Sequence, residues 1–259
     1  MENDIVLQTM IRAAIKAGNI LKKMFISGAT VGIEKGNNYY DIVSKADIAS
    51  EGVIIKILIN ALPNIKILSE EKGFIDNQSQ GTIVIDPLDG SSNFLLGMPH
   101  FSVAMAYVED GQILASVVYN PVMKKMYTAQ KGKGAFLNGK KLVSGEVKNL
   151  QHIAVNFSHQ ATWKEKRLFF DKIYASGTSR VMNNWSPNLD FCLLAENKID
   201  VVVSKDSLLY DFAPGLLIAK ESGCFEFPSI EKVNVNVDAA MSFVVANSKT
   251  LSAKLHEII

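Results

Sequence analysis

The sequence has few of the features that would point to a membrane protein, a disulfide framework or a cysteine metal site. Its 259 residues include two cysteines, Cys192 and Cys224, and no Cys-x-x-Cys pair, so buried thiols are expected rather than a disulfide or a metal pair. No apolar run reaches the roughly 18 residues that a membrane helix needs. The first residues include the acids Glu2 and Asp4 rather than a basic leader segment. We therefore expect a cytoplasmic protein without a membrane partner.

The sequence also lacks an excess of positive or negative charge. The chain has 27 Lys and Arg against 26 Asp and Glu, a net charge of +1, and its basic residues are dispersed rather than clustered as a nucleic-acid surface requires. No phosphate-binding Gly-x-x-x-x-Gly-Lys-[Ser/Thr] loop is present, and the four histidines show no ligand spacing. The expected partner is a small molecule, and no nucleic acid.

The composition present is that of a globular protein with a large core. Apolar residues make up 48% and charged residues 20% of the chain. Alternating apolar residues between 101 and 129 predict an antiparallel meander. Later patterns predict strands that alternate with helices, the strands at 153–157, 179–182, 199–203 and 243–246 and the helices at 162–175, 187–197, 212–222 and 248–257. We expect an α+β protein with lobes at 1–150 and 151–259 joined in one structural unit.

The strongest chemical signal lies in residues 82–94. Ile83–Ile85 are β-branched and predict a buried strand. Asp86 follows, and Pro87 predicts a turn that brings Asp89 back beside Asp86. Two carboxylates at close range repel each other unless a cation lies between them, and oxygen ligands suit Mg²⁺ better than Zn²⁺. A divalent metal site is the interpretation that this spacing favours.

The next residues predict an anion site beside that metal. Gly90 lets the backbone approach a ligand, and Ser91 and Ser92 would open a helical turn whose free N–H groups point outward. On local evidence, Asp-Pro-x-Asp-Gly could instead be a solvated loop with an Asp or Ser helix cap.

The full string Asp-Pro-Leu-Asp-Gly-Ser-Ser-Asn-Phe at 86–94 closely resembles the signature of the inositol monophosphatase family of Mg²⁺-dependent, lithium-sensitive phosphatases. The resemblance implies an αβαβα sandwich of the inositol monophosphatase and sugar phosphatase type, with the metal site between the lobes. It also implies two or three Mg²⁺ ions and a homodimer.

For three more acids, the local sequence pattern and the family resemblance predict different roles. Asp47 precedes a helical stripe and could be an N-cap, Glu70 follows a strand at 65–68 in a pair that is usually solvated, and Asp211 could cap the helix after it. The segment 41–47 resembles the family's Asp-x-Val-[Thr/Ser]-x-x-Asp. Ser69-Glu70-Glu71 is similar to Gly-Glu-Glu, with Ser for Gly. The segment 210–215 is similar to Trp-Asp-x-Ala-[Ala/Gly]-Gly, with Tyr210 for Trp and Pro214 for a small residue, the proline being expected in the first helical turn.

Taken together, these matches imply phosphate-monoester hydrolysis by direct attack of a metal-activated water. The implied metal ligands are Glu70, Asp86, the carbonyl of Leu88, Asp89 and Asp211; the catalytic groups are Glu70, Asp47 and Ser91; and the phosphate-binding residues are Gly90, Ser91 and Ser92. Two further phosphatases on the same scaffold stay open, a fructose-1,6-bisphosphatase and an adenosine 3′,5′-bisphosphate 3′-phosphatase. A non-catalytic metal-binding regulatory protein is the alternative from another class.

The substrate-binding positions depart from the family pattern. In inositol-processing members an acid seven residues before the Trp-Asp aspartate contacts the substrate ring, and that position is Ser204 here. Their Gly-[Thr/Ser]-Ala-Ala segment aligns with residues 185–188, where Pro187 has no N–H to donate. Asp206 or another acid could fill the place of the missing one. We expect inositol phosphate to be a mediocre substrate, with another small sugar or polyol phosphate, or a bisphosphate held by Lys205 or Arg180, preferred.

Overall fold

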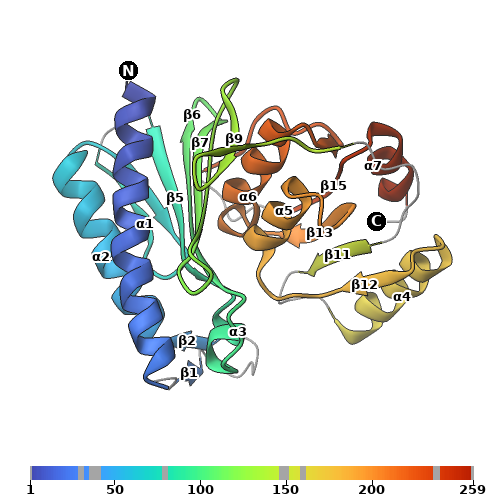
Figure 1. The fold of residues 1–259 in the computed structure, drawn as a ribbon, viewed down its shortest axis with the longest axis horizontal. Coiled ribbons are helices and arrows are strands. Elements are labelled where there is room, and N and C mark those ends of the chain that lie inside the picture. The colour runs from blue at the N-terminus through green and yellow to red at the C-terminus, as the bar shows by residue number, and fades with distance from the viewer. Residues whose placement is uncertain are drawn as a thin grey trace.

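The computed structural model describes residues 2–28, 32–34, 42–77, 81–145, 152–157, 162–235 and 240–257. The chain forms an α+β fold of five layers in the order αβαβα, with two sheets that each have helices on both faces (Figure 1). None of the helices in these ranges has the length and apolar character needed to cross a bilayer.

The larger sheet has eight strands in the order β10-β9-β8-β7-β6-β5-β3-β4. Its members are β3 (Lys66–Ser69), β4 (Gly73–Ile75), β5 (Gly81–Asp89), β6 (Ser102–Glu109), β7 (Gln112–Asn120), β8 (Lys125–Gln130), β9 (Gly134–Leu137) and β10 (Lys140–Leu142). The strands from β5 to β10 pair antiparallel in chain order, which confirms the expected meander, while β3 runs parallel to β5. The strands β3 and β5 therefore end side by side.

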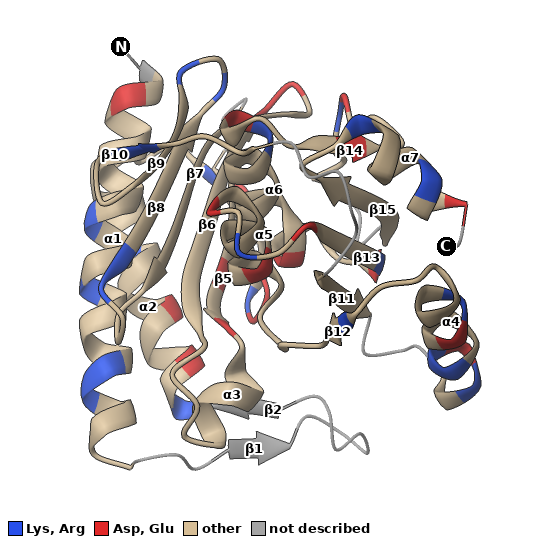
Figure 2. Cartoon of the chain, turned by 45° about the vertical axis from the view of Figure 1, so that its right-hand side comes forward, with Lys and Arg blue, Asp and Glu red and all other residues tan. Residues whose placement is uncertain are grey.

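Two helices cover the outer face of this sheet, α1 (Glu2–Ile26) and α2 (Lys45–Ala61). One face of α1 is buried against the sheet, including Met10, Ala14 and Leu21, and the helix ends before Gly28, whose φ is 67°. The basic residues of α1 lie along the outside of the fold (Figure 2).

The smaller sheet has five strands in the order β12-β11-β13-β15-β14. They are β11 (His152–Phe157), β12 (Arg180–Met182), β13 (Val201–Ser207), β14 (Phe225–Phe227) and β15 (Met241–Ala246). The helices α4 (Trp163–Ala175) and α7 (Lys249–His256) cover its outer face, while α5 (Pro187–Ala195) and α6 (Leu209–Ser222) lie between the two sheets. Cys192 of α5 and Cys224 are free and buried, as predicted.

Four short strands were not predicted, namely β1 (Gly32–Glu34), β2 (Ile42–Ser44), β4 and β14. Each has three residues, too few for an alternation to be recognised. The larger sheet uses residues before 143 and the smaller one residues after 151. Whether 1–150 and 151–259 behave as separate lobes stays a prediction.

Candidate active site

A bulge in β5 aims two acids at the central helices. The sequence predicted a turn at Pro87, and that prediction is wrong, because the strand continues to Asp89 with a register shift between Asp86 and Asp89. Side chains alternate along a strand, so residues three apart would normally face opposite sides, and one extra residue restores the same side. Proline fits the bulge because it has no N–H for the ladder, and the Leu88 N–H donates to the Asp86 carboxylate (3.1 Å).

Asp86 stands at the centre of the acids named by the sequence. It is 2% exposed. Burial is the largest cause that raises its pKa well above the ordinary value, followed by the charges of Glu70, Asp89, Asp211 and Asp47. The structure therefore brings together the five acids that the sequence proposed, from four separate segments of the chain.

Asp89 lies at the N-terminus of α5. Its carboxylate accepts hydrogen bonds from the hydroxyls of Ser102 (2.8 Å) and Ser186 (2.6 Å) and a long one from the Asn188 N–H (3.4 Å). Burial raises its pKa to about 6, and these hydrogen bonds oppose the rise. The sequence had singled out Pro187 for its missing N–H, but it gave no sign that Ser186 and Asn188, on either side, would hold Asp89.

Asn188 also connects α5 to the helix that carries Asp211. The structure corrects two expectations for α6: the helix begins at Leu209, so Asp211 lies inside the first turn rather than at the cap, and Pro214 is further inside the helix than its first turn. A proline there leaves the carbonyl four residues earlier without its helical donor. The Asn188 amide donates to that carbonyl, of Tyr210 (3.0 Å), and its oxygen accepts the Gly215 N–H (3.0 Å).

Replacing Asn188 by alanine should therefore lower the free energy of unfolding by about 2–6 kcal/mol, because two buried backbone groups lose partners at about 1–3 kcal/mol each. Urea unfolding measures the loss. Asn60→Ala, at an exposed position near the end of α2, is the control and should change stability by less than about 0.5 kcal/mol. Equal small losses in both variants would show that the bridge does not support α6.

Glu70 is held in its turn by an acid that sequence reasoning missed. Glu51, one helical turn after Asp47 on α2, is 1% exposed. Its carboxylate accepts hydrogen bonds from the Ser69 hydroxyl (2.6 Å) and from the Lys72 N–H (2.9 Å). These two bonds fix the backbone on both sides of Glu70. The Ser-for-Gly difference at position 69 therefore supplies a contact. The four-residue spacing from Asp47 was the available signal, since residues i and i+4 share a helix face.

Asp47 lies inside the first turn of α2, because that helix begins at Lys45, and the N-cap interpretation is wrong in position. Asp47 is 2% exposed, and its charge raises the pKa of Asp86. Ser91 and Ser92 open α3 (Ser91–Leu95) as predicted. Gly90 before them has a φ of 90°, and a side chain there would meet the His100 carbonyl at 2.9 Å, so the position requires glycine.

Ser204 lies on β13 facing α5. Its hydroxyl is buried and has no hydrogen-bond partner among the described residues. Asp206 does not replace it as a buried acid, because its side chain is about half exposed and accepts a hydrogen bond from Ser242 (2.9 Å). The buried acid in this region is Asp190 of α5, whose pKa burial raises to about 8 and which lies near Asn156, the strand neighbour of Ser204.

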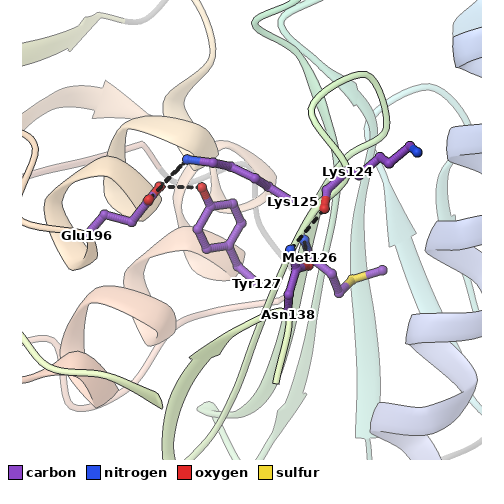
Figure 3. A network of polar contacts seen from close by, with 6 residues as sticks. All are labelled: Lys124, Lys125, Met126, Tyr127, Asn138 and Glu196. Carbon is purple, nitrogen blue, oxygen red and sulfur yellow. Dashed lines mark hydrogen bonds and ion pairs between the residues drawn. The ribbon is translucent and has the colours of Figure 1, made fainter. Parts of the chain in front are cut away.

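The other end of α5 is fixed to the larger sheet. Glu196, just after the helix, accepts hydrogen bonds from the Lys125 ammonium (2.8 Å) and the Tyr127 hydroxyl (2.5 Å) of β8 (Figure 3). Burial is the main cause that raises the pKa of Tyr127, so its hydroxyl stays a donor. The helix that carries Ser186 and Asn188 is thus anchored at both ends.

The chemistry of these donors fits a hard divalent cation. Several carboxylates are buried beside one another, and their mutual repulsion is relieved by a cation bound through oxygen. Within the described ranges, no three His, Cys, Asp or Glu side chains converge tightly enough to form a ready-made cage for an ion. The acids interact through their charges, and binding a cation would require their side chains to move closer together.

These raised pKa values predict how stability depends on pH. Burial raises the pKa of Asp211 to about 7 and of Asp89 to about 6, and the unfolded value is near 3.8. The folded state thus retains protons that the unfolded state releases, so the stability of metal-free protein should fall as pH rises from about 4 to about 8. Added Mg²⁺ should raise the Tm more at pH 8 than at pH 5, because protons compete with the cation.

Thermal unfolding in chelator and in excess Mg²⁺, at matched ionic strength, measures both effects. If the Tm in chelator were highest at pH 8, the conclusion that these buried acids repel one another when ionised would be wrong.

Known proteins resemble this chain along its whole length. The profile of the inositol monophosphatase family matches residues 2–259. An inositol-1-monophosphatase of Mesorhizobium japonicum is 33% identical over 231 residues, 87% of this chain and 86% of that protein. A protein named Nus factor SuhB, of Vibrio cholerae, is 33% identical over 222 residues, covering 84% and 82%.

Solved structures agree with these relatives. The extragenic suppressor protein suhB from Bartonella henselae superposes with a TM-score of 0.86 at 28% identity, over 98% of this chain and 97% of that one. A gene product described as an inositol monophosphatase-fructose 1,6-bisphosphatase superposes with a TM-score of 0.81 at 27% identity, over 97% and 98%. The fold is therefore shared with these solved structures.

Proposed function

Because the chain belongs to the inositol monophosphatase family, we propose that it is a Mg²⁺-dependent phosphatase of a small sugar, polyol or inositol phosphate, acting as a cytoplasmic homodimer. Membership of this family makes the protein a phosphomonoesterase. The observation that supports the choice of a divalent cation is the neighbourhood of Asp86, where burial and then the charges of four other acids raise the pKa of Asp86. Such repulsion costs stability unless a cation offsets it.

The residues that would hold the cation are Glu70, Asp86, Asp89, Asp211 and the carbonyl of Leu88. When bound, Mg²⁺ supplies a Lewis acid that activates water and neutralises charge on the phosphoryl group. Glu70 and the Ser91 hydroxyl, the latter polarised by Asp47, position the attacking water and accept its proton. The N–H groups of residues 90–92 hold phosphate oxygens at the start of α3.

A regulatory role is the second candidate, and the relatives named Nus factor SuhB favour it. One measurement distinguishes the regulatory role from catalysis: the Mg²⁺-dependent release of phosphate from a panel of esters. A protein that releases no phosphate from any ester at any Mg²⁺ concentration would favour the regulatory role.

The same panel tests the substrate prediction. Ser204 offers no charge for a ring hydroxyl, and lost polar contacts weaken discrimination by about 1 kcal/mol each. We expect inositol 1-phosphate to have a lower kcat/KM than the best of fructose 1,6-bisphosphate, glycerol phosphate, histidinol phosphate and adenosine 3′,5′-bisphosphate. Inositol 1-phosphate leading the panel by about tenfold would contradict this prediction and leave the metal chemistry standing.

A further inference from the structure

Trp185 has a backbone conformation that an aromatic residue rarely adopts. Its φ is 54°, in the left-handed region. The other non-glycine residues described with positive φ are Asp110, Lys124, Asn138, Asn197 and Asp206, and Asn and Asp tolerate this region best. The resemblance places position 185 at the glycine of the family's Gly-[Thr/Ser]-Ala-Ala segment, and glycine is the residue that adopts a positive φ without strain.

The strain cannot relax, because the residues on both sides are fixed. The Asn184 carbonyl accepts a hydrogen bond from the Asn93 amide (2.7 Å), and the Asn184 amide donates to Asp190 (2.6 Å). On the other side, the Ser186 hydroxyl donates to Asp89 (2.6 Å). The surroundings therefore determine the conformation at Trp185.

The backbone carbonyl of Trp185 lies against the predicted phosphate-binding turn. A Cβ built on Gly90 would come within 3.2 Å of the Trp185 carbonyl. Yet 51% of Trp185 is exposed, so packing does not compensate for the strained backbone. Strained residues are retained at ligand sites, where the strained conformation serves binding. Trp185 directly precedes Ser186, whose hydroxyl bonds Asp89, and a half-exposed indole at this point offers a flat apolar face for part of a ligand.

Resting on the phosphatase activity proposed above, though not on a sugar or polyol as its substrate, we propose that Trp185 packs against the leaving group of the substrate and selects phosphate monoesters whose alcohol carries a planar aromatic ring, as nucleotides do. A polyol ring presents hydroxyls all round and needs charged acceptors, which Ser204 does not supply. A flat ring needs contact area, which an indole supplies, and stacking of a base on an aromatic side chain contributes about 1–3 kcal/mol.

The test compares two esters that differ in planarity but share a primary alcohol as leaving group, benzyl phosphate and cyclohexylmethyl phosphate, with the Mg²⁺-loaded protein. The wild type should favour benzyl phosphate by about tenfold in kcat/KM, and Trp185→Gly should lose about tenfold on benzyl phosphate but less than about threefold on the saturated ester. Trp185→Phe should retain most of the preference. Trp163→Phe, at an 81% exposed position on α4, is the matched control and should change neither rate.

The Tm of the Trp185→Gly variant gives a second readout. If Trp185 served only to support the fold, its loss would lower the Tm. Glycine adopts a φ of 54° without strain, so Trp185→Gly should raise the Tm while it weakens the aromatic preference. A Trp185→Gly variant that has a lower Tm, fails to fold or slows both esters equally would overturn the proposal.

The two tryptophans of the chain allow a binding measurement that needs no turnover. In a Trp163→Phe background, the remaining fluorescence comes from Trp185 and should be quenched by benzyl phosphate and by adenosine 5′-monophosphate, but not by cyclohexylmethyl phosphate. Absence of quenching would overturn the proposal for Trp185, whereas failure of the proposed function would appear as no phosphate release from any ester.

Discussion

Replacing Asp89 by asparagine is expected to lower Mg²⁺-dependent phosphate release by at least about a thousandfold, the equivalent of about 4 kcal/mol of transition-state stabilisation. Asp89 is 1% exposed and is held by Ser102, Ser186 and Asn188. Asparagine has the same shape, and the two serine hydroxyls can reorient to donate or accept. The fold should therefore survive while one proposed metal ligand loses its charge.

The variant should also separate metal binding from folding. Removing one of several neighbouring charges relieves repulsion, so the Tm of the metal-free variant should equal or exceed that of the metal-free wild type, and the gain in Tm on adding Mg²⁺ should shrink. Asp171→Asn, on the exposed face of α4, is the matched control and should keep both activity and the Mg²⁺ gain. Undiminished phosphate release by wild-type protein in chelator would show that the proposed metal chemistry is wrong.

Ser91→Ala and Asp47→Asn are expected to lower kcat by about a hundredfold or more each, within the range for groups that transfer a proton in the transition state. If Asp47 acts only through the Ser91 hydroxyl, the double variant should be little slower than either single variant. Each kcat is measured at saturating substrate and Mg²⁺, and the unfolding free energies are measured in parallel.

Two outcomes would contradict this coupling. Fully additive losses would mean that Asp47 and Ser91 act on different steps. An Asp47→Asn protein with normal kcat but lower stability would mean that Asp47 serves only the first turn of α2, where an acid interacts favourably with the helix dipole. Ser92→Ala removes a hydroxyl at the same helix start but keeps the backbone N–H proposed to bind phosphate, so it is the control for the loss of a hydroxyl.

The sequence predicted which acids lie near one another better than it predicted the backbone that brings them together. Asp86 and Asp89 were placed beside each other by a turn at Pro87, whereas the structure uses a bulge that keeps both in β5. The error has a physical cause, since proline removes a ladder donor in a turn and in a bulge alike, and a local pattern cannot distinguish them. The starts of α2 and α6 were also misplaced, which changed Asp47 and Asp211 from caps to first-turn residues.

Residues that support the site were missed because their partners are far away in the chain. Ser186 meets Asp89 across 97 positions, and Asn188 meets Gly215 across 27. Neither residue has a local feature that marks it. Asn188 became recognisable only when Pro214, inside α6, left the Tyr210 carbonyl without its helical donor.

By itself, the sequence determined the family, the identity of the acids and the strands and helices long enough to show a period, because short motifs and side-chain alternation are local properties. The tertiary structure alone decided which face of β5 carries the acids, which helix ends meet them and which residues hold them in place. It also decided that Trp185 would be strained and exposed beside Gly90. These features depend on contacts between segments of both sheets, and no local stretch of sequence contains both partners of such a contact.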